Sequence, residues 1–336
     1  MAEKKYKQVT RKDVAEEAGV SVTIVSYVIN NNRYVDKEKR IKVEEAIKKL
    51  HYKPNSIARA LKGKKLNHIV FIADQIVTEH FSLLVSELDK HAYDLGYMIS
   101  LCSNRNTQQF IDSIISRQYD GVIISSISFD KEYIKQLIAA DIPVVLLVNR
   151  DYDDIEGAAK IENGLYEGAR ENVRYLQRKG CKNIIYVDRF SQRKHFSDMR
   201  YRGFYEEMKQ SGLSEHPEKN FITGCHNEEE VKEKVAEYLK TNKVDAIFGR
   251  NDKVACIAMQ SAKKMGYKIP EDIKVIGFDN SSLGQYCEPP ISSMEIQREQ
   301  IAKTAIEMLR QMIEEHIIPE KVMYRTKLIE RKSTLG

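Results

Sequence analysis

The sequence lacks the long apolar runs, paired cysteines and hydrophobic leader that mark membrane and secreted proteins. Nothing in its 336 residues approaches the roughly 18 consecutive apolar residues of a transmembrane helix. The first residues, MAEKKYKQVTRKD, carry charge but no hydrophobic stretch, so we expect no export signal. The five cysteines are scattered without a CxxC pair, which disfavours a disulfide framework or a zinc site. These absences predict a protein of the reducing cytoplasm without membrane contact.

Sequence motifs of common enzymes are missing as well. The chain has no GxGxxG, P-loop, HExxH or GxSxG sequence. We therefore predict that the protein is not an enzyme and that it uses no catalytic residue, metal or cofactor. Apolar residues make up 42% of the chain, which is enough to build the cores of two or three domains.

Charge is distributed unevenly along the chain. Residues 1–65 contain 17 lysines and arginines against 8 acidic residues, a net charge of +9 in a chain whose total is +5. The remaining residues are therefore mildly acidic. This asymmetry predicts that a small basic head, and not the body, contacts a polyanion.

Two short amphipathic segments lie within residues 9–30 on either side of Gly19, whose conformational freedom suits a sharp turn. The first segment begins at Thr10, and Asp13 is spaced to complete a capping box. The second begins at Ser21, a favoured N-cap residue. Two such helices are typical of a helix-turn-helix motif, whose second helix enters the DNA major groove. From this pattern alone, a helical hairpin without a role in DNA binding remains the alternative.

A third amphipathic helix is predicted over residues 37–50, and Pro54 ends it. The pattern thus predicts a small all-α head. Residues 55–61 predict another short helix that has too few apolar positions to be stable alone. We interpret it as the linker to the body.

The body alternates strand-like and helix-like segments. Strands are predicted at residues 69–73, 98–102, 121–125, 144–148, 184–187, 246–248 and 275–278, with helices at 81–95, 108–117, 131–139, 167–179, 199–211, 228–241, 254–265 and 299–314. This alternation predicts doubly wound parallel sheets that bind ligands at the carboxyl ends of their strands. About 270 residues exceed one typical core, so we expect two α/β lobes.

Short motifs follow one another in an order that is specific in combination. They are DVAEEAGVS (13–21), VSYVINN (25–31), YKPNSIARALKGKK (52–65), DLGY (94–97), DGVIISS (120–126), IPVVLLVNR (142–150), RYRGF (200–204), IPEDIKVIGFDN (269–280), PPISS (289–293) and IERKST (329–334). With these motifs the chain resembles the lactose-repressor-type (LacI/GalR) transcription regulators over nearly its whole length.

The resemblance implies a helix-turn-helix head over residues 1–54, a hinge helix and linker over 55–65, and a two-lobed body over 66–336 that is similar to type I periplasmic binding proteins. It implies a homodimer that binds a near-palindromic DNA operator as a repressor. A small-molecule effector, a sugar or sugar derivative, would bind between the lobes and change the spacing of the two hinge segments. The sequence shows no leucine-heptad tail, so we expect a dimer and not a tetramer.

DNA contacts implied by the resemblance lie on the second helix and its flanks. Base-edge contacts are expected from Val22, Thr23 and Tyr27, and contacts with phosphates or the groove margin from Thr10, Ser21, Ser26, Asn30 and Tyr34. Many relatives have an arginine where Tyr27 stands. Because tyrosine cannot make the bidentate contact of arginine with guanine, we predict a weaker guanine requirement there.

The hinge supplies a second set of implied contacts. Leu61 is expected to wedge into the minor groove, and Ala58 is small enough to let two hinge helices approach. Asn55, at the start of the hinge helix, completes the predicted DNA-binding set.

Effector contacts implied by the resemblance follow the body strands. They are Asp74, Phe81, Ser125, Asn149, Arg200, Asn251 and Asp279. Such carboxylate, guanidinium and amide groups supply the donors and acceptors that polyhydroxylated sugars need. We interpret the neighbouring Asp252 as the N-cap of the next helix.

Two departures from the family pattern leave alternatives open. In ENGLYEGA (162–169), either Glu162 and Asn163 or Gly164 and Leu165 occupy a ligand position. Arginines on the expected rim of the site make a sugar phosphate an alternative to a neutral sugar, unless they are solvated surface residues. They are Arg150, Arg189, Arg193, Arg250 and Arg298.

Two other functions deserve comparison with an effector-controlled regulator. One is a DNA-binding regulator whose body no longer binds a ligand. The other is a free sugar-binding protein, which the basic head and the expected absence of an export signal disfavour.

Overall fold

The computed structural model describes residues 9–53, 65–188 and 198–335 of the chain. It divides into two compact units, residues 1–66 and 67–336. None of the helices in the described ranges is long and apolar enough to cross a membrane.

Three helices build the first unit: α1 (Arg11–Ala18), α2 (Val22–Asn30) and α3 (Lys37–Lys49). Their shared core consists of Val14, Ala15, Ala18, Val25, Val28, Val43, Ala46 and Tyr52. Every helix contributes at least two of these side chains, so the apolar contacts fix the helices against one another.

The caps of α1 and α2 confirm the predicted helix boundaries. Thr10 accepts a hydrogen bond from the Asp13 N–H, and the Asp13 carboxylate accepts one from the Thr10 N–H. Gly19 closes α1 at φ 63°, a conformation that glycine adopts without strain. Ser21 Oγ accepts the N–H of Ile24 at 3.3 Å. The turn between the two helices is therefore specified locally.

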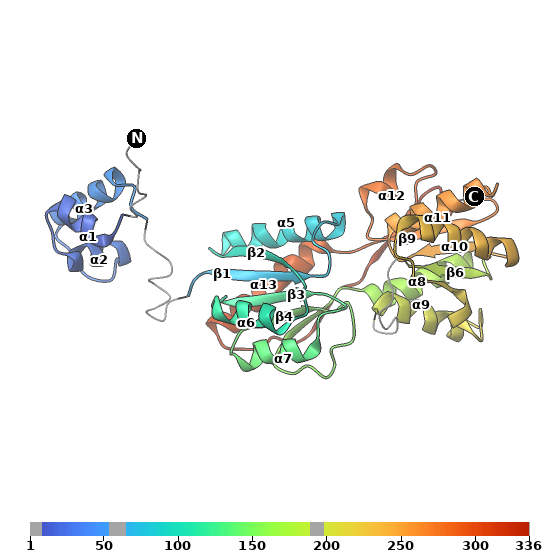
Figure 1. The fold of residues 1–336 in the computed structure, drawn as a ribbon, viewed down its shortest axis with the longest axis horizontal. Helices are drawn as coiled ribbons and strands as arrows, with labels where there is room; N and C mark the ends of the chain where they lie inside the picture. Colours follow the sequence, from blue (N-terminus) through green and yellow to red (C-terminus); the bar gives the residue numbers. More distant parts are fainter. Residues whose placement is uncertain (1–8, 54–64, 189–197, 336) are drawn as a thin grey trace. The chain divides into compact units, whose positions relative to one another are not determined.

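The second unit contains two lobes, each built on a six-stranded sheet (Figure 1). The first sheet is parallel, in the order β11-β5-β4-β3-β1-β2. Its strands are β1 (His68–Ala73), β2 (Met98–Ser103), β3 (Gly121–Ser125), β4 (Val144–Leu147), β5 (Ala159–Glu162) and β11 (Val322–Met323). Its helices are α5 (Glu79–Asp94), α6 (Gln108–Ser116), α7 (Lys131–Ala139) and α13 (Arg298–Glu314). Because α5 and α13 share one apolar core and α6 and α7 another, they cover opposite faces.

The second sheet has the order β12-β10-β9-β8-β6-β7, and only the pairing of β12 with β10 is antiparallel among the pairs described. Its strands are β6 (Ile184–Val187), β7 (Phe221–Ile222), β8 (Ala246–Gly249), β9 (Lys274–Phe278), β10 (Ser292–Glu295) and β12 (Lys327–Ile329). Its helices are α8 (Leu165–Arg178), α9 (Met199–Gln210), α10 (Glu228–Thr241), α11 (Asp252–Lys264) and α12 (Ser282–Tyr286), with a 3₁₀ turn at Pro217–Asn220.

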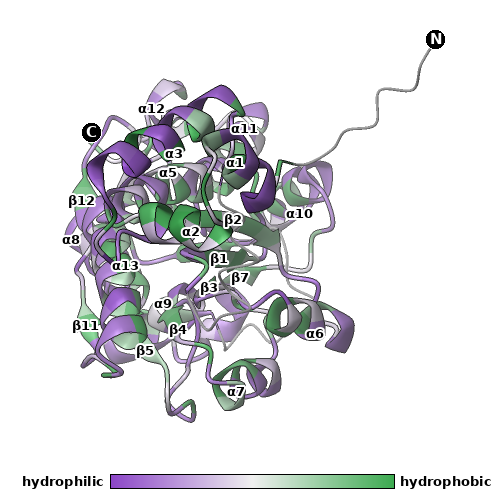
Figure 2. Cartoon of the chain, turned by 90° about the vertical axis from the view of Figure 1, so that its left-hand side faces the viewer, coloured by the Kyte–Doolittle hydropathy of each residue, from purple (hydrophilic) through white to green (hydrophobic). Residues whose placement is uncertain are grey.

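The chain passes between the two sheets three times: after β5, after β10 and after β11. As a result, α13 follows a strand of the second sheet but packs on the first. Hydropathy colouring shows the strand β1 in green, in keeping with its five consecutive buried residues, while α10 carries purple stretches (Figure 2). The three crossings and the two six-stranded sheets confirm the predicted two-lobed α/β body.

The seven strands predicted from the sequence are all present, with ends that differ by at most one residue. The sequence did not indicate β5, β7, β10, β11 and β12, which have two to four residues each. These strands carry polar residues, as in β10, or are too short to show a period. Pairing with an existing sheet, and not local propensity, makes them strands.

The close packing of α8 against α9 at Gly203 can be tested by substitution. A Cβ atom at Gly203 would lie 2.3 Å from the backbone carbonyl oxygen of Tyr166. We therefore expect Gly203→Ala to force the helices apart and destabilise the protein by roughly 1–3 kcal/mol or more. Denaturant unfolding measures this loss, and Lys209→Ala on the exposed side of α9 is the control. Equal unfolding free energies of Gly203→Ala and wild type would contradict the predicted clash.

Candidate functional site

The exposed face of α2 is built from the residues predicted to contact DNA. Val22 is 44% exposed, and Ser21 and Thr23 beside it are also exposed, whereas Val25 and Val28 are buried in the core. Much of α2 is coloured green because five of its residues are valine or isoleucine, and Val22 is the one of these five that is exposed (Figure 2). Apolar side chains here suit contact with thymine methyl groups.

Other predicted DNA contacts are partly occupied by internal hydrogen bonds. Asn30 Nδ2 donates to the backbone oxygen of Ser26 at 2.7 Å and to its hydroxyl at 3.1 Å. The Thr10 hydroxyl donates to the Asp13 carboxylate at 2.6 Å within the capping box. Tyr34, by contrast, is 92% exposed. These bonds orient Thr10, Ser26 and Asn30 before any ligand arrives.

Arg33 is a candidate DNA contact that the sequence analysis missed. Its guanidinium carbon lies 5.3 Å from the centroid of the Tyr27 ring, and Nη1 lies 3.5 Å from the Tyr27 hydroxyl. This cation–π contact holds a guanidinium beside the Tyr27 ring. The sequence indicates this contact only by the spacing of six residues between Tyr27 and Arg33, and Arg33 lies beyond the end of α2.

The hinge residues Asn55, Ala58 and Leu61 lie outside the described residues, as do Arg189 and Arg193.

Polar side chains link the ends of three strands in the first lobe. Asn149 Nδ2 donates to Ser125 Oγ at 2.9 Å, and Asn163 Nδ2 donates to Asn149 Oδ1 at 2.8 Å. Asn163 Oδ1 is buried and has no hydrogen-bond partner among the described residues. Gly164, which has no side chain to contribute, is the N-cap of α8 at φ 77°.

Asp74 binds neighbouring groups of its own lobe. Its carboxylate accepts hydrogen bonds from the hydroxyls of Ser126 and Ser128, the amide of Asn104 and the N–H of Ile127. These bonds hold the loop after β3 against the end of β1. Most of the acceptor capacity of Asp74 is therefore used within the lobe.

A buried ion-pair network follows the strands of the second lobe. Arg250 donates to Asp198 Oδ2 from Nε at 2.9 Å and from Nη2 at 2.7 Å, and its Nε lies 3.4 Å from Asp188 Oδ2. Burial by itself would raise the pKa of Asp198, but the guanidinium groups of Arg250 and Arg200 lower it to about 2. The carboxylate is therefore ionised at neutral pH.

Arg200 and Asp279 adjoin this network with unused hydrogen-bonding capacity. Arg200 Nη1 lies 3.6 Å from Asp279 Oδ1, and the guanidinium sits over the Phe278 ring at 5.5 Å. Arg200 Nε and Asp279 Oδ1 are both buried without a hydrogen-bond partner among the described residues. Asp279 also adopts φ 90°, a strained conformation for a non-glycine residue.

Side chains at the start of α5 connect the lobes. Arg298 Nε donates to His80 Nδ1 at 3.3 Å and Arg298 Nη2 donates to the Asp279 backbone oxygen, while Ser282 donates to Glu79 through its N–H and hydroxyl at 2.8 Å each. Burial chiefly lowers the pKa of His80 to about 4, with Asp279 opposing the shift, so the imidazole is neutral at pH 7.

Phe81, the remaining first-lobe residue of the predicted effector set, packs against other aromatic rings. The Phe81 ring is half-buried, 5.0 Å from the His80 ring and 6.3 Å from the Phe71 ring. Packing thus fixes Phe81 beside the interlobe contacts.

The sequence interpretation of Asn251 and Asp252 needs correction. Asn251 is the N-cap of α11, where its Oδ1 accepts the Val254 N–H at 3.0 Å. Asp252 instead is buried and accepts hydrogen bonds from Ser281 N–H and Ser293 Oγ. Burial raises the pKa of Asp252 to about 7. The cap was assigned one residue too late because both residue types favour that position.

Three of the rim arginines are engaged in the structure. Arg150 donates to the carbonyl oxygens of Ile127 and Phe129, Arg250 pairs with Asp198, and Arg298 bridges the lobes. The interpretation of these three as solvated surface residues is therefore wrong.

Comparison with known proteins places both parts of the chain. Residues 10–55 match the model of bacterial regulatory proteins of the lacI family, and residues 173–334 match a periplasmic binding protein-like domain. The HTH-type transcriptional repressor PurR of Histophilus somni is 30% identical over 312 residues, covering 91% of this chain and 92% of that protein.

Solved structures of similar fold include members of the same family. The lac repressor dimer bound to operator and the anti-inducer ONPF has a TM-score of 0.85 at 23% identity, covering 98% of this chain and 100% of that one. A periplasmic binding protein/LacI transcriptional regulator of Alkaliphilus metalliredigens, complexed with D-xylulofuranose, has a TM-score of 0.67 at 26% identity, covering 80% and 100%.

A helix-turn-helix head joined to a two-lobed, periplasmic-binding-protein-like body defines a ligand-responsive DNA-binding transcription regulator. The chain belongs to the lacI family of bacterial regulatory proteins. It is a transcriptional regulator and not an enzyme.

The buried pair gives a prediction for the second lobe. Arg250→Gln removes both hydrogen bonds to the buried Asp198 carboxylate, so we expect a loss of roughly 3–5 kcal/mol of unfolding free energy at pH 7. Arg202→Gln, in the exposed pair with Glu206, should change it by no more than about 0.5 kcal/mol.

We expect acidic pH to remove the difference in unfolding free energy between Arg250→Gln and wild type. Because the folded state lowers the pKa of Asp198, its contribution is present above about pH 4 and fades as the pH falls toward about 2. Denaturant unfolding across this range measures the effect. An Arg250→Gln protein as stable as wild type at pH 7 would show that the pair is not stabilising.

Proposed function

We propose that this protein is a homodimeric cytoplasmic repressor that binds a near-palindromic operator and is controlled by a neutral polyhydroxylated molecule bound between its lobes. In this proposal residues 1–54 form the head, 55–65 the hinge and 66–336 the body. The observation that carries the ligand assignment is the pair of unsatisfied, buried groups on Arg200 and Asp279. Leaving such groups unpaired costs free energy that a polar ligand recovers.

Groups of both lobes would share the ligand. Asn163 Oδ1 in the first lobe is a third buried polar atom without a hydrogen-bond partner among the described residues, and Phe81 offers an aromatic surface. A carboxylate and a guanidinium 3.6 Å apart can accept from and donate to adjacent hydroxyl groups. Ser125 and Asn149 act in this proposal by orienting Asn163, while Asp74 supports the loop after β3.

Charge balance favours a neutral sugar over a sugar phosphate. Among the described residues here, three carboxylates face three guanidinium groups: Asp188, Asp198 and Asp279 against Arg200, Arg250 and Arg298. Each of these cations already has a carboxylate or carbonyl oxygen nearby. A phosphate would therefore meet no excess of positive charge among these groups.

Exposed apolar side chains support the homodimer. On the first lobe they gather on α5 and the edge strand β2, as Leu83, Tyr93, Leu95, Met98 and Leu101, and on the second lobe as Leu283 and Tyr286 of α12. Patches of this kind mark protein contacts, and a two-fold axis would let each patch meet its own copy.

A ligand screen tests the proposed effector class. We expect neutral mono- or disaccharides, with cellobiose and D-xylulose among those tried, to raise the melting temperature of the full-length protein, since ligand at about 100 times Kd adds about 2.7 kcal/mol. Asp279→Asn should abolish the shift, whereas Asp89→Asn on the exposed side of α5 should keep it. A shift only with phosphorylated sugars would contradict the neutral class, and no shift in the whole panel would indicate a body without a ligand.

Selection of operator sequences tests the base contacts assigned to the head. We expect Tyr27→Arg to gain a guanine preference at one position of each half-site, because arginine makes the bidentate contact that tyrosine lacks. Arg33→Ala should relax base preference at a position by about 1–3 kcal/mol in binding free energy. In-vitro selection with full-length protein measures both, with Lys39→Ala on α3 as a control that keeps the preferences. Identical selected sites for wild type and both variants would contradict the assigned contacts.

A further inference from the structure

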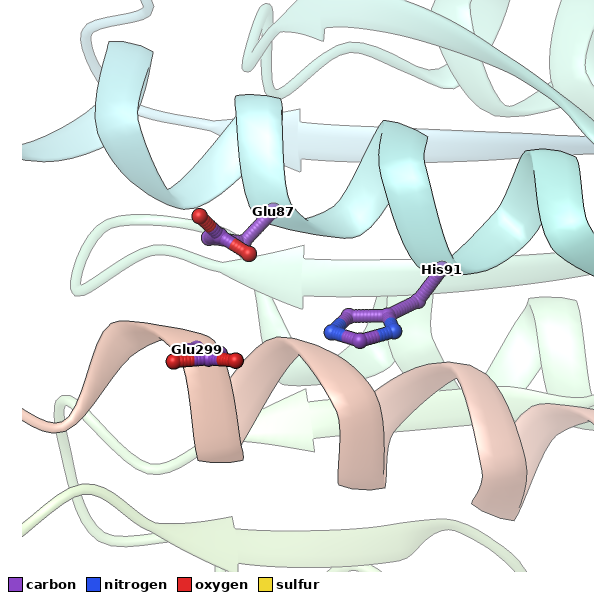
Figure 3. Close-up of side chains that lie close together, drawn as sticks. All are labelled: Glu87, His91 and Glu299. Atoms are coloured by element: carbon purple, nitrogen blue, oxygen red, sulfur yellow. The ribbon is translucent and has the colours of Figure 1, made fainter.

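Three potential metal ligands meet where α5 packs against α13 (Figure 3). Glu87 and His91 lie four residues apart on α5 and so share one face of the helix. Glu299 reaches them from the first turn of α13. One ligand atom from each residue lies within 4.8 Å of the other two. Glu299 is more than 200 positions from Glu87 and His91 in the chain, and the packing of the two helices brings it beside them.

Two of the three groups have unused hydrogen-bonding atoms. Glu87 Oε2 and His91 Nε2 are inaccessible to solvent and have no hydrogen-bond partner among the described residues. The exposed Lys90 on the same helix forms an ion pair with Glu87, but its Nζ lies 3.6 Å from Glu87 Oε2, beyond hydrogen-bond distance. A buried polar atom without a partner costs roughly 1–3 kcal/mol, which a bound cation would offset.

We propose that Glu87, His91 and Glu299 form a binding site for a divalent transition-metal ion such as Zn²⁺. One imidazole and two carboxylates are a mixed nitrogen and oxygen donor set that suits zinc and its first-row neighbours. Mg²⁺ and Ca²⁺ fit less well because they prefer oxygen ligands alone. Three protein ligands leave at least one coordination position for water.

The geometry needs only a small adjustment to bind the ion. Ligand atoms of a tetrahedral zinc site lie about 3.4 Å apart, given metal–ligand distances of about 2.1 Å. Glu299 is exposed and can change rotamer to close the remaining gap. The helix pair therefore provides a partly formed site with one adaptable ligand.

Metal binding would tie together two helices whose first turns carry the interlobe contacts. Arg298, next to Glu299, donates to His80 Nδ1 and to the Asp279 backbone oxygen. Glu79, at the start of α5, accepts two hydrogen bonds from Ser282. An ion that fixes α5 to α13 thus acts on the same contacts that join the lobes. The metal site itself does not depend on the identity of the effector.

Cobalt binding tests the site directly. Tag-free, EDTA-stripped and desalted full-length protein is titrated with Co²⁺ and followed by its visible absorption, and Zn²⁺ is then added in competition. We expect one ion per protomer and displacement by Zn²⁺. His91→Gln and Glu299→Gln should each weaken binding at least tenfold. His216→Gln is the matched control, because His216 lies 3.1 Å from Glu218 in an exposed pair distant in sequence from α5 and α13.

Either of two results would overturn the proposal: no stoichiometric Co²⁺ or Zn²⁺ binding by the wild type, or unchanged affinity in both site variants. Thermal unfolding without metal checks that the variants fold. Glu299→Gln alters an exposed residue, so it remains a valid test if His91→Gln unfolds.

Discussion

Buried charge in the second lobe is the constraint on which the interlobe site depends. Asp198 caps α9, and Arg250 follows β8, so their ion pair joins a helix start to a strand end. A buried carboxylate must be paired, and this pairing fixes the start of α9. Arg200 is the second residue of that helix, and its guanidinium therefore points to Asp279. The ion pair of Asp198 with Arg250 therefore positions Arg200 beside Asp279, where atoms of both residues lack a hydrogen-bond partner among the described residues.

The sequence predicted the local features of the head because they arise from neighbours along the chain. Thr10 with Asp13 and the cap at Ser21 involve residues three positions apart, and the turn at Gly19 involves residues at most five positions apart. The same holds for strands such as β3, whose apolar residues are consecutive. Short strands such as β11 and β12 form by pairing with partners distant in the chain, so no local sequence pattern predicts them.

Residue roles in the site were harder to predict than residue positions. The resemblance located Asp74 and Asn251 at strand ends, but only the structure shows that hydrogen bonds to Ser126 and Val254 occupy their oxygens. The cysteine spacing likewise disfavours a zinc site. Glu87, His91 and Glu299 form no sequence motif, because two helices far apart in the chain bring them together.

Helix α13 explains how distant parts of the body can influence one another. It leaves the second lobe after β10, yet packs on the first lobe beside α5. Its first residue, Arg298, contacts His80 of one lobe and Asp279 of the other. Because His80 is neutral at pH 7, it can accept the Arg298 hydrogen bond at Nδ1 without charge repulsion. A ligand that engages Asp279 must therefore act on a backbone that Arg298 already holds. In the proposed function, a rearrangement there would reach α5, which belongs to the lobe that follows residues 55–65 in the chain.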